Sequence, residues 1–416
     1  MTQPTGAADP SEARRHIVVT GVGAVTALGV GARALHRRWV AGELGIADGV
    51  GAAVAFEPAD HLTVKQARRA DRFTQLAVVA ADEALAEAGW PGGLAGYDPS
   101  RVACIIGTGI GGLGTLEREI AALGDRGPVG LSPLGIPMLM GNAAAATVAM
   151  RAGVHGPGFA TLSACAAGAN AIGTGVRLIQ SGDVDAAIVG GSEATLTPFA
   201  STAFARMGTL SADGESRPFD VRRSGFVMGE GAGVLVLEDE DRARRRGAAI
   251  LGTVAGYATT LDAHHLTAPD PEGTWAAVAM SRALEDARVP PSEVDYVNAH
   301  GTSTPLNDAA EARALRIALG DRAGTVPVSS TKSTLGHLLG AGGAVEAIAT
   351  LLALADGVAP PNLGFEHADP AIELHVVAGG PERLPAPVGR PLTAISNSFG
   401  FGGHNAVLCL QAPDAG

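Results

Sequence analysis

Short apolar runs alternate with longer amphipathic stretches along most of this sequence. The runs are rich in Val, Ile and Ala, as is typical of strands that are buried on both faces. They predict strands at 16–20, 102–106, 186–189 and 234–237, and then, in a second series, at 252–257, 296–299, 326–329 and 406–410.

The stretches between these runs carry apolar residues at the spacing of helices. Helices are predicted at 70–89, 166–181, 274–287 and 309–319. Strands that alternate with helices are typical of an α/β fold with largely parallel sheets. Because the two series look alike, we expect two similar halves, residues 15–250 and 251–416, after a flexible tail at 1–14.

The composition changes this picture in one respect, the closeness of packing. The 416 residues are 46% hydrophobic and include 58 glycines, whereas aromatic residues make up only 4%. Close contact between backbones is therefore expected in the core. The net charge of -12 argues against nucleic-acid binding, because a partner of that kind selects basic surfaces.

The cysteines and the N-terminus indicate the compartment. Cys104, Cys165 and Cys409 are far apart and odd in number, which suits a reducing cytoplasm better than a disulfide framework. Residues 1–14 lack the apolar segment of a signal peptide. The most apolar helical stretch, 342–355, is too short to cross a bilayer, so we expect a soluble cytoplasmic protein without membrane partners.

Cys165 is a candidate nucleophile. It lies among small residues, TLSACAAG at 161–168, between a short strand-like segment and the helix predicted at 166–181. Backbone N–H groups at a helix N-terminus favour a thiolate and can hold an oxyanion. A lone cysteine is also commonly a buried structural residue, and two histidine motifs decide between these readings.

The first motif is His300-Gly-Thr-Ser-Thr304, which follows a predicted strand. The carboxyl end of a parallel strand is where α/β folds place chemistry. The hydroxyls of Thr302 and Thr304 are suited to a polar substrate arm. The alternative for this motif alone is a histidine packed in the core.

The second motif is Lys332-Ser-Thr-Leu-Gly-His337. Lys332 follows an apolar run and is expected to be drawn inward, where it needs a partner such as Glu346 on the next helix. His337 is expected at a helix start, where the dipole favours the neutral ring, and a neutral imidazole can donate to a developing oxyanion. The alternative is a surface lysine with a helix-terminal histidine.

Two further patterns are weaker. Residues 107–112, GTGIGG, match G-x-G-x-x-G, but the acidic strand end of a dinucleotide site does not follow, so close packing beside a pocket is favoured. The pair His264-His265 has no suitably spaced Cys or acidic neighbours, and no metal site is expected.

Taken together, the motifs resemble those of the β-ketoacyl-[acyl-carrier-protein] synthases of the thiolase superfamily, particularly the type II elongating condensing enzymes. The segments that carry this resemblance are VVTGVGAVTALG (18–29), GTGIGGLG (107–114), the Cys165 segment, GGSEA (190–194), GFVMGEGAG (225–233), HGTST (300–304), KSTLGH (332–337) and NSFGFGGHN (397–405). The resemblance implies a five-layered α-β-α-β-α sandwich of two similar halves, normally a dimer.

The resemblance also implies a reaction. Cys165 would take an acyl chain, and His300 and His337 would stabilise the enolate formed when malonyl-acyl carrier protein loses carbon dioxide. Attack on the acyl group would give a 3-oxoacyl product. Lys332, paired with Glu346, would hold the histidines. No cofactor would be bound, because the carrier supplies the phosphopantetheine arm.

Further residues take roles by the same resemblance. The amides of Cys165 and Phe401 would form the oxyanion hole, and Phe401 would also be the gating aromatic. The substrate-binding residues would be Thr302 and Thr304 with Thr267 on the pantetheine arm, and Ile110 and Gly135 at the acyl pocket. The acidic carrier would dock on a basic patch of Lys65, Arg68 and Arg69, with Arg206 near the entrance; the alternative is a solvated helix face.

Gly135 departs from the pattern of fatty-acid enzymes, which usually place a larger apolar residue there. We expect a deeper pocket for a longer, stiffer or more polar chain. A catalytic ketosynthase subunit of a type II polyketide or polyene system, paired with a homologous subunit lacking the cysteine, is therefore the close alternative to a fatty-acid homodimer.

Other classes fit less well. A cysteine hydrolase would need neither the second histidine nor the buried lysine. A degradative thiolase would use a second cysteine late in the chain, and Cys409 falls in a predicted strand. A non-catalytic partner subunit would lack Cys165.

Overall fold

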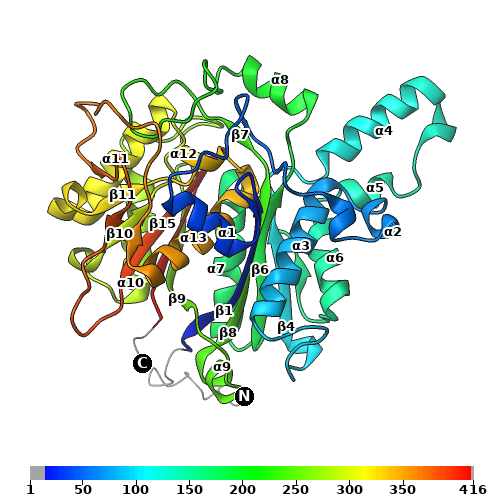
Figure 1. Cartoon of the computed structure of the whole chain (residues 1–416), viewed down its shortest axis with the longest axis horizontal. Coiled ribbons are helices and arrows are strands. Elements are labelled where there is room, and N and C mark those ends of the chain that lie inside the picture. Colours follow the sequence, from blue (N-terminus) through cyan, green and yellow to red (C-terminus); the bar gives the residue numbers. More distant parts are fainter. Residues whose placement is uncertain (1–14, 414–416) are drawn as a thin grey trace, which may run out of the picture.

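The computed structural model describes residues 15–413 (Figure 1). The predicted tail at 1–14 lies outside these residues. Within them, a 12-stranded mixed sheet organises the chain. Its order is β5 (Gly158–Phe159), β4 (Val102–Gly107), β6 (Ala186–Glu193), β8 (Gly231–Asp239), β1 (Ile17–Thr26), β9 (Gly252–Leu261), β16 (His404–Gln411), β15 (Thr393–Gly400), β10 (Tyr296–Asn298), β11 (Pro327–Ser329) and β13 (His375–Val376), with β2 (Gly29–Val30) paired to β1.

The helices surround this sheet on both faces. They are α1 (Ala32–Val40), α2 (Val64–Ala67), α3 (Arg72–Glu87), α4 (Leu113–Arg126), α5 (Gly135–Leu139), α6 (Ala143–Ala152), α7 (Ala167–Gln180), α8 (Pro198–Arg206), α9 (Glu240–Arg245), α10 (Thr274–Ala287), α11 (Pro305–Leu319), α12 (Lys332–Leu335) and α13 (Gly342–Asp356). Short 3-10 helices are η1 (Pro58–Asp60), η2 (Pro99–Arg101), η3 (Pro128–Gly130), η4 (Ala164–Ala166), η5 (Pro291–Glu293), η6 (Gly320–Gly324) and η7 (Leu339–Ala341). Two small sheets pair β3 (Val50–Gly51) with β7 (Met228–Gly229), and β12 (Val358–Ala359) with β14 (Glu382–Arg383).

The sheet repeats one pattern of strand directions. In the first part of the chain, β1 and β6 flank β8 antiparallel, and β6, β4 and β5 run parallel. In the second part, β9 and β15 flank β16 antiparallel, and β15, β10 and β11 run parallel. The expectation of largely parallel sheets is therefore wrong, because a strand covered on both faces is a continuous apolar run in either direction.

The two parts are stacked around a shared helical layer. Helices α7 and α13 pack against each other and against inward faces of strands from both parts. Helices α3 and α6 cover the outer face of one part, and α10 and α11 cover that of the other (Figure 1). The result is five layers, with α7 and α13 in the middle.

Glycines in the strands let the helices pack closely against the sheet. A Cβ on Gly21 of β1 would lie 2.1 Å from the Ala84 carbonyl oxygen of α3. A Cβ on Gly256 of β9 would lie 2.1 Å from the Ala283 carbonyl oxygen of α10. The glycine-rich, alanine-rich composition thus sets the distance between layers in both parts.

The apolar helical stretch at the centre is longer than the predicted 342–355, because the η7 turn leads directly into α13. Within the described residues, Leu339–Asp356 is long and apolar enough to cross a membrane by length and composition, with a mean hydropathy of 1.4. However, 89% of this stretch is buried in the fold. The core helix of a soluble protein passes the same test, and here the apolar residues pack between the strands of the two parts.

Candidate active site

Cys165 lies on the turn that leads from β5 into α7. It is 7% exposed, within η4, and the preceding Ala164 has a positive φ of 49°, which places the thiol on a tight turn. Gly400 of β15 packs against this turn, since a Cβ there would lie 3.0 Å from the Cys165 amide nitrogen. Both parts of the chain therefore shape the position of the sulfur.

The electrostatic state of Cys165 differs from the expected thiolate. Burial raises its pKa to about 12, although the positive charge of Lys332 and the Phe401 N–H both act in the opposite direction. Desolvation outweighs the helix N-terminus here, because the sulfur is almost wholly enclosed. The resting residue is a thiol, so a nucleophilic role would require it to lose its proton.

Two histidines from the second part of the chain lie against each other. The rings of His300, which follows β10, and His337, which follows α12, meet edge to face with centroids 5.4 Å apart. The Leu339 N–H donates to His337 Nδ1 at 3.3 Å, so the neutral ring carries its proton on Nε2. His300 Nδ1 has no partner within the described residues.

Both imidazoles are held neutral. Burial lowers the pKa of His300 and of His337 well below 6.5, and the charge of Lys332 acts in the same direction. The helix dipole that the sequence suggested is a smaller influence, because His337 precedes the short η7 turn and α13 begins only at Gly342.

Lys332 lies behind the histidines as a buried cation. It is 2% exposed, and its Nζ is 2.5 Å from Glu346 Oε1 on α13. Thr331 also donates to this oxygen at 3.2 Å. The expected Lys332–Glu346 pair is thus formed, and its cation is felt at both histidines and at Cys165.

A cavity of about 440 Å³ joins Cys165 and both histidines. Eight of the residues singled out from the sequence line it: Ile110, Cys165, Thr267, His300, Thr302, Thr304, His337 and Phe401. Its surface is mainly apolar, with aromatic rings from Phe204, Phe226 and Phe399. The Thr302 and Thr304 hydroxyls are hydrogen-bonded to each other at 2.9 Å, where they can bind a polar arm.

Other predicted residues lie elsewhere. Gly135 starts α5 and packs against the Glu119 side chain, away from the cavity lining of this single chain. Lys65, Arg68 and Arg69 are exposed at and after α2, and Arg206 is exposed at the end of α8, between cavity residues Phe204 and Gly208. In Figure 1, α2 and α8 are well separated.

The sequence reasoning missed the groups that hold the histidines. Glu311 of α11 accepts the His300 and Gly301 N–H groups, each at 2.8 Å, and burial raises its pKa to about 7. The rings of Phe399 and Phe226 contact His300 and His337 at centroid distances of 5.5 and 5.4 Å. Nothing in the sequence marked Glu311 as a buried residue, because a carboxylate in an amphipathic helix usually faces solvent.

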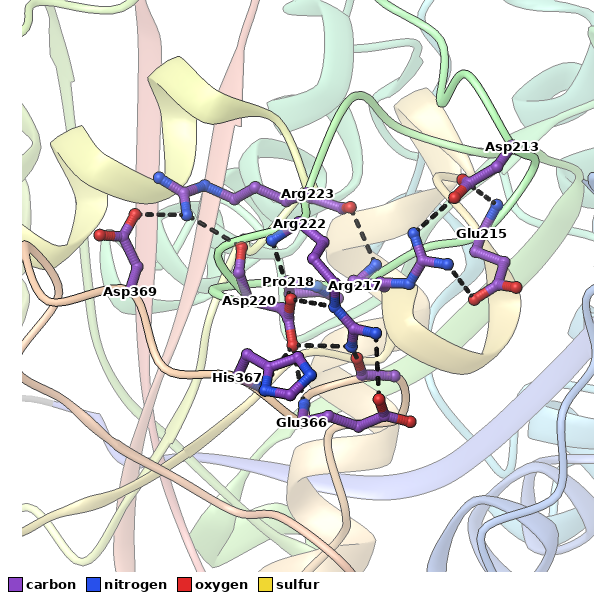
Figure 2. Close-up of polar contacts among 12 residues, drawn as sticks. Asp213, Glu215, Arg217, Pro218, Asp220, Arg222, Arg223, Glu366, His367 and Asp369 are labelled. Atoms are coloured by element: carbon purple, nitrogen blue, oxygen red, sulfur yellow. Dashed lines mark hydrogen bonds and ion pairs between the residues drawn. The ribbon is translucent and has the colours of Figure 1, made fainter.

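An ionic network fastens the segment that supports His337. Asp220 accepts the N–H groups of Glu366 and His367 at 2.7 and 2.8 Å and pairs with Arg222, while Arg223 pairs with Asp369 (Figure 2). The same segment continues into β7, where the His337 N–H donates to the Val227 carbonyl and the Gly229 N–H to the His337 carbonyl. The backbone of His337 is therefore held on both sides.

Comparison with known proteins places this geometry in a family. The chain matches the patterns described as beta-ketoacyl synthase, N-terminal domain, over 49–243 and beta-ketoacyl synthase, C-terminal domain, over 251–366. It is 42% identical to the 3-oxoacyl-[acyl-carrier-protein] synthase 2 of Synechocystis sp., over 96% of this chain and 98% of that protein. The Staphylococcus aureus protein of the same name is 41% identical, over 96% and 99%.

Solved structures agree. One is described as a type II PKS acyl-carrier protein in complex with its ketosynthase bound to the hexaketide, with a TM-score of 0.87 at 29% identity, covering 96% of this chain and 100% of that one. The ishigamide ketosynthase/chain length factor gives 0.86 at 33% identity, covering 97% and 100%. The chain belongs to the β-ketoacyl synthase family, and the expected thiolase-like fold is confirmed. It is an acyltransferase that condenses acyl chains in fatty acid or polyketide elongation.

Proposed function

We propose that Cys165, His300 and His337 carry out a decarboxylative Claisen condensation of a Cys165-bound acyl chain with malonyl-acyl carrier protein. The observation that supports this most is one cavity lined by a thiol and two neutral histidines, with a buried Lys332–Glu346 pair behind them. The product is 3-oxoacyl-acyl carrier protein.

In the first half-reaction, the Cys165 sulfur attacks the carbonyl carbon of an acyl thioester. Because burial keeps Cys165 protonated, a neutral histidine in the same cavity accepts the proton as the sulfur–carbon bond forms. The N–H groups of Cys165 and Phe401 hold the oxyanion. The carrier thiolate leaves and takes up the proton, and the chain stays on Cys165.

In the second half-reaction, malonyl thioester occupies the space beside the histidines. His337 Nε2–H and the N–H of His300 donate to the thioester oxygen, so charge can develop there as carbon dioxide leaves. The resulting enolate carbon attacks the acyl carbonyl and the carbon–sulfur bond breaks. Cys165 leaves as a thiolate, which carries the charge of the lost carboxylate, and takes up one proton from solvent. Neutral donors suit this step, and burial keeps both rings neutral, with the charge of Lys332 acting in the same direction.

The substrate arm is supplied by the partner. Thr302, Thr304 and Thr267 line the cavity and would bind the phosphopantetheine arm of an acyl carrier protein, with Phe401 as the gate and Ile110 at the acyl end. The exposed cations Lys65, Arg68 and Arg69 form the docking patch for the acidic carrier, and Arg206 lies beside the cavity.

A type II polyketide role is the second candidate, favoured by a solved relative described as a ketosynthase/chain length factor. In that case the chain pairs with a homologous subunit rather than a second copy. Gly135 offers a test: a Gly135→Phe variant has to displace the Glu119 side chain, which is 3.2 Å from the Cβ position. Shorter accepted chains would support a pocket role, and unchanged chain lengths would refute it.

Two further expectations complete the proposal. The chain divides into an N-terminal half, 15–250, which carries the nucleophile, and a C-terminal half, 251–416, which carries both histidines. The protein works in solution in the cytoplasm, as its buried apolar helix and lone, buried cysteines suit.

The deciding experiment is an intact-mass assay of carrier proteins. The purified protein receives acyl carriers of several lengths plus malonyl carrier, beside Cys165→Ala and the matched control Cys104→Ala, whose thiol is buried away from the cavity. The proposal predicts a two-carbon 3-oxoacyl extension that Cys165→Ala alone abolishes. Acylation of Cys165 without extension indicates a missing partner subunit. Free acid without malonyl indicates a hydrolase, and no acylation at all contradicts the nucleophile assignment.

A further inference from the structure

Glu193 is a buried carboxylate that the mechanism above does not use. It ends β6 and is fully enclosed. Its Oε2 accepts the Gly109 N–H at 2.6 Å and the Gly340 N–H at 3.1 Å. Its Oε1 accepts the Thr108 hydroxyl at 3.1 Å and the Ile110 N–H at 3.4 Å. Within residues 15–413, no Lys or Arg pairs with it, in contrast to Glu346.

The donors come from two loops that lie in backbone contact around this carboxylate. A Cβ on Gly340 would lie 2.1 Å from the Gly109 nitrogen, and a Cβ on Gly109 would lie 2.7 Å from Glu193 Oε2. A Cβ on Gly191, two residues before Glu193, would lie 2.6 Å from the Gly340 carbonyl oxygen. The absence of side chains here brings the loop after β4 against the turn after His337.

Each loop carries a group that faces the cavity. Ile110 lines it from the loop after β4, and Leu339 lines it from the turn after His337. Leu339 has a positive φ of 46°, a conformation that a branched side chain adopts only when its surroundings enforce it. In this conformation the Leu339 N–H donates to His337 Nδ1, which places the ring proton on Nε2.

We propose that Glu193 is a positioning residue for the condensation. Glu193 accepts hydrogen bonds from the Gly340 N–H and from the loop that carries Ile110. It thereby fixes the turn at Leu339 relative to the wall of the acyl pocket, and this turn holds His337 in the tautomer that carries its proton on Nε2. This inference rests on the proposed role of His337. Glu193 acts through the two loops and does not touch substrate.

A carboxylate is the side chain suited to this place. Four donors converge on it, and only an ionised carboxyl accepts from all of them without offering a donor of its own. A glutamine keeps one oxygen but turns an NH₂ group toward one pair of donors. Glu193→Gln preserves the volume but sets an NH₂ group either against Thr108 and Ile110 of one loop or against Gly109 and Gly340, which belong to the two loops. Glu193→Asp preserves the charge while shortening the reach.

The test separates the two half-reactions in an enzyme first shown to condense. Acylation of Cys165 is followed by intact mass, and decarboxylation of malonyl carrier by the appearance of acetyl carrier. For Glu193→Gln we expect the kcat of decarboxylation to fall about 10- to 100-fold, with KM for malonyl carrier unchanged, as for a displaced catalytic group. Acylation of Cys165 should fall by less than about 3-fold, because the thiol, its oxyanion donors and His300 are left in place, and loss of the Glu193 charge removes one influence that raises the pKa of the thiol.

Glu238→Gln is the matched control. Glu238 is a fully buried carboxylate at the other end of the same strand pair, where it is bound by Tyr97 and Arg246. The Glu238→Gln variant should have a lower thermal stability, but the ratio of its decarboxylation rate to its acylation rate should equal that of the wild type. The proposal is overturned if Glu193→Gln leaves that ratio at its wild-type value. If Glu193→Gln does not fold, Glu193→Asp is judged by the same ratio, with the same outcome for or against.

Failure of this inference is distinguishable from failure of the proposed function. If the wild-type protein neither acylates nor condenses, the role of Cys165 and His337 fails before any Glu193 variant is tested. If the wild-type protein condenses and Glu193→Gln decarboxylates equally well, only the positioning role fails.

Discussion

The two parts of the sheet share one architecture and differ in their chemistry. Strands β1, β8 and β6 have the same mutual directions as β9, β16 and β15, and each part packs a helix against a strand glycine. At the strand ends, however, one part presents a thiol and the other presents two imidazoles. The comparison teaches that the strand pattern is repeated while the thiol and the imidazoles are not, so the cavity is complete only where the parts meet.

The buried carboxylates sharpen this contrast. Glu193 in the first part is satisfied by N–H and O–H donors alone, and Glu346 in the second is paired with Lys332. The N–H and O–H donors around Glu193 join two loops and supply no positive charge. The charge of Lys332 thus acts on both histidines, whereas the charge of Glu193 acts on Cys165, whose pKa it helps to raise.

The largest expected effect comes from breaking the ion pair. Lys332→Met leaves Glu346 buried without its cation, which destabilises a protein by about 3–5 kcal/mol. Urea unfolding measures this loss. Condensation should fall by about 1,000-fold, since the cavity loses the buried cation whose charge acts on both histidines and on Cys165.

The double variant Lys332→Met/Glu346→Gln is the control for this prediction. It removes the unpaired charge and should recover most of the stability but none of the activity. If the single and double variants are equally stable, Lys332 and Glu346 do not depend on each other as the 2.5 Å contact indicates.

A smaller effect tests whether the two parts are equivalent in packing. Gly21→Ala and Gly256→Ala each place a Cβ at 2.1 Å from a helix carbonyl oxygen, so each should cost about 1–3 kcal/mol. The exposed Gly124 in α4 has open space around it, and Gly124→Ala should be neutral or stabilising by up to about 1 kcal/mol. Unequal losses of stability in the Gly21→Ala and Gly256→Ala variants would show that one helix can shift away from its strand more easily than the other.

The sequence predicted the repeated parts of the fold better than the directions of its strands. The helix expected at 274–287 has those bounds in α10, because its apolar spacing is regular. Strand β15 was missed, since the polar residues Ser396, Asn397 and Ser398 interrupt its apolar run. The relative directions of the strands could not be predicted either, because pairing between strands that are distant in sequence leaves no local sequence pattern.

The site was predictable where residues differ from their surroundings. His300 and Lys332 stood out because each follows an apolar run, and Cys165 because of its small neighbours. The structure places Cys165, His300 and His337 on one cavity, with Lys332 behind it. The protonation state of the thiol was not predictable. It depends on desolvation by groups from both parts of the chain, such as Gly400, and a helix N-terminus alone suggested the opposite direction.

The smallest expected effect concerns pH. Burial raises the pKa of Glu193 to about 7, so between pH 4.5 and 7 the folded state binds more protons there than the unfolded state does. This contribution to stability is complete below pH 4.5 and is lost as the pH rises through 7. His300 and His337 act oppositely, because their lowered pKa values give stability that is present above pH 6.5 and lost in acid.

Glu193→Gln removes one of these opposing trends. Between pH 5 and 6.5, the stability of the variant relative to wild type should rise with pH, by at most about 1.4 kcal/mol per pH unit. Urea unfolding at several pH values measures this slope. Burial also raises the pKa of Glu311 to about 7, so Glu311→Gln should give the same slope from the other part of the chain. A flat difference for both variants would mean that these carboxyls are ionised in the folded protein at pH 5, with their N–H donors outweighing burial.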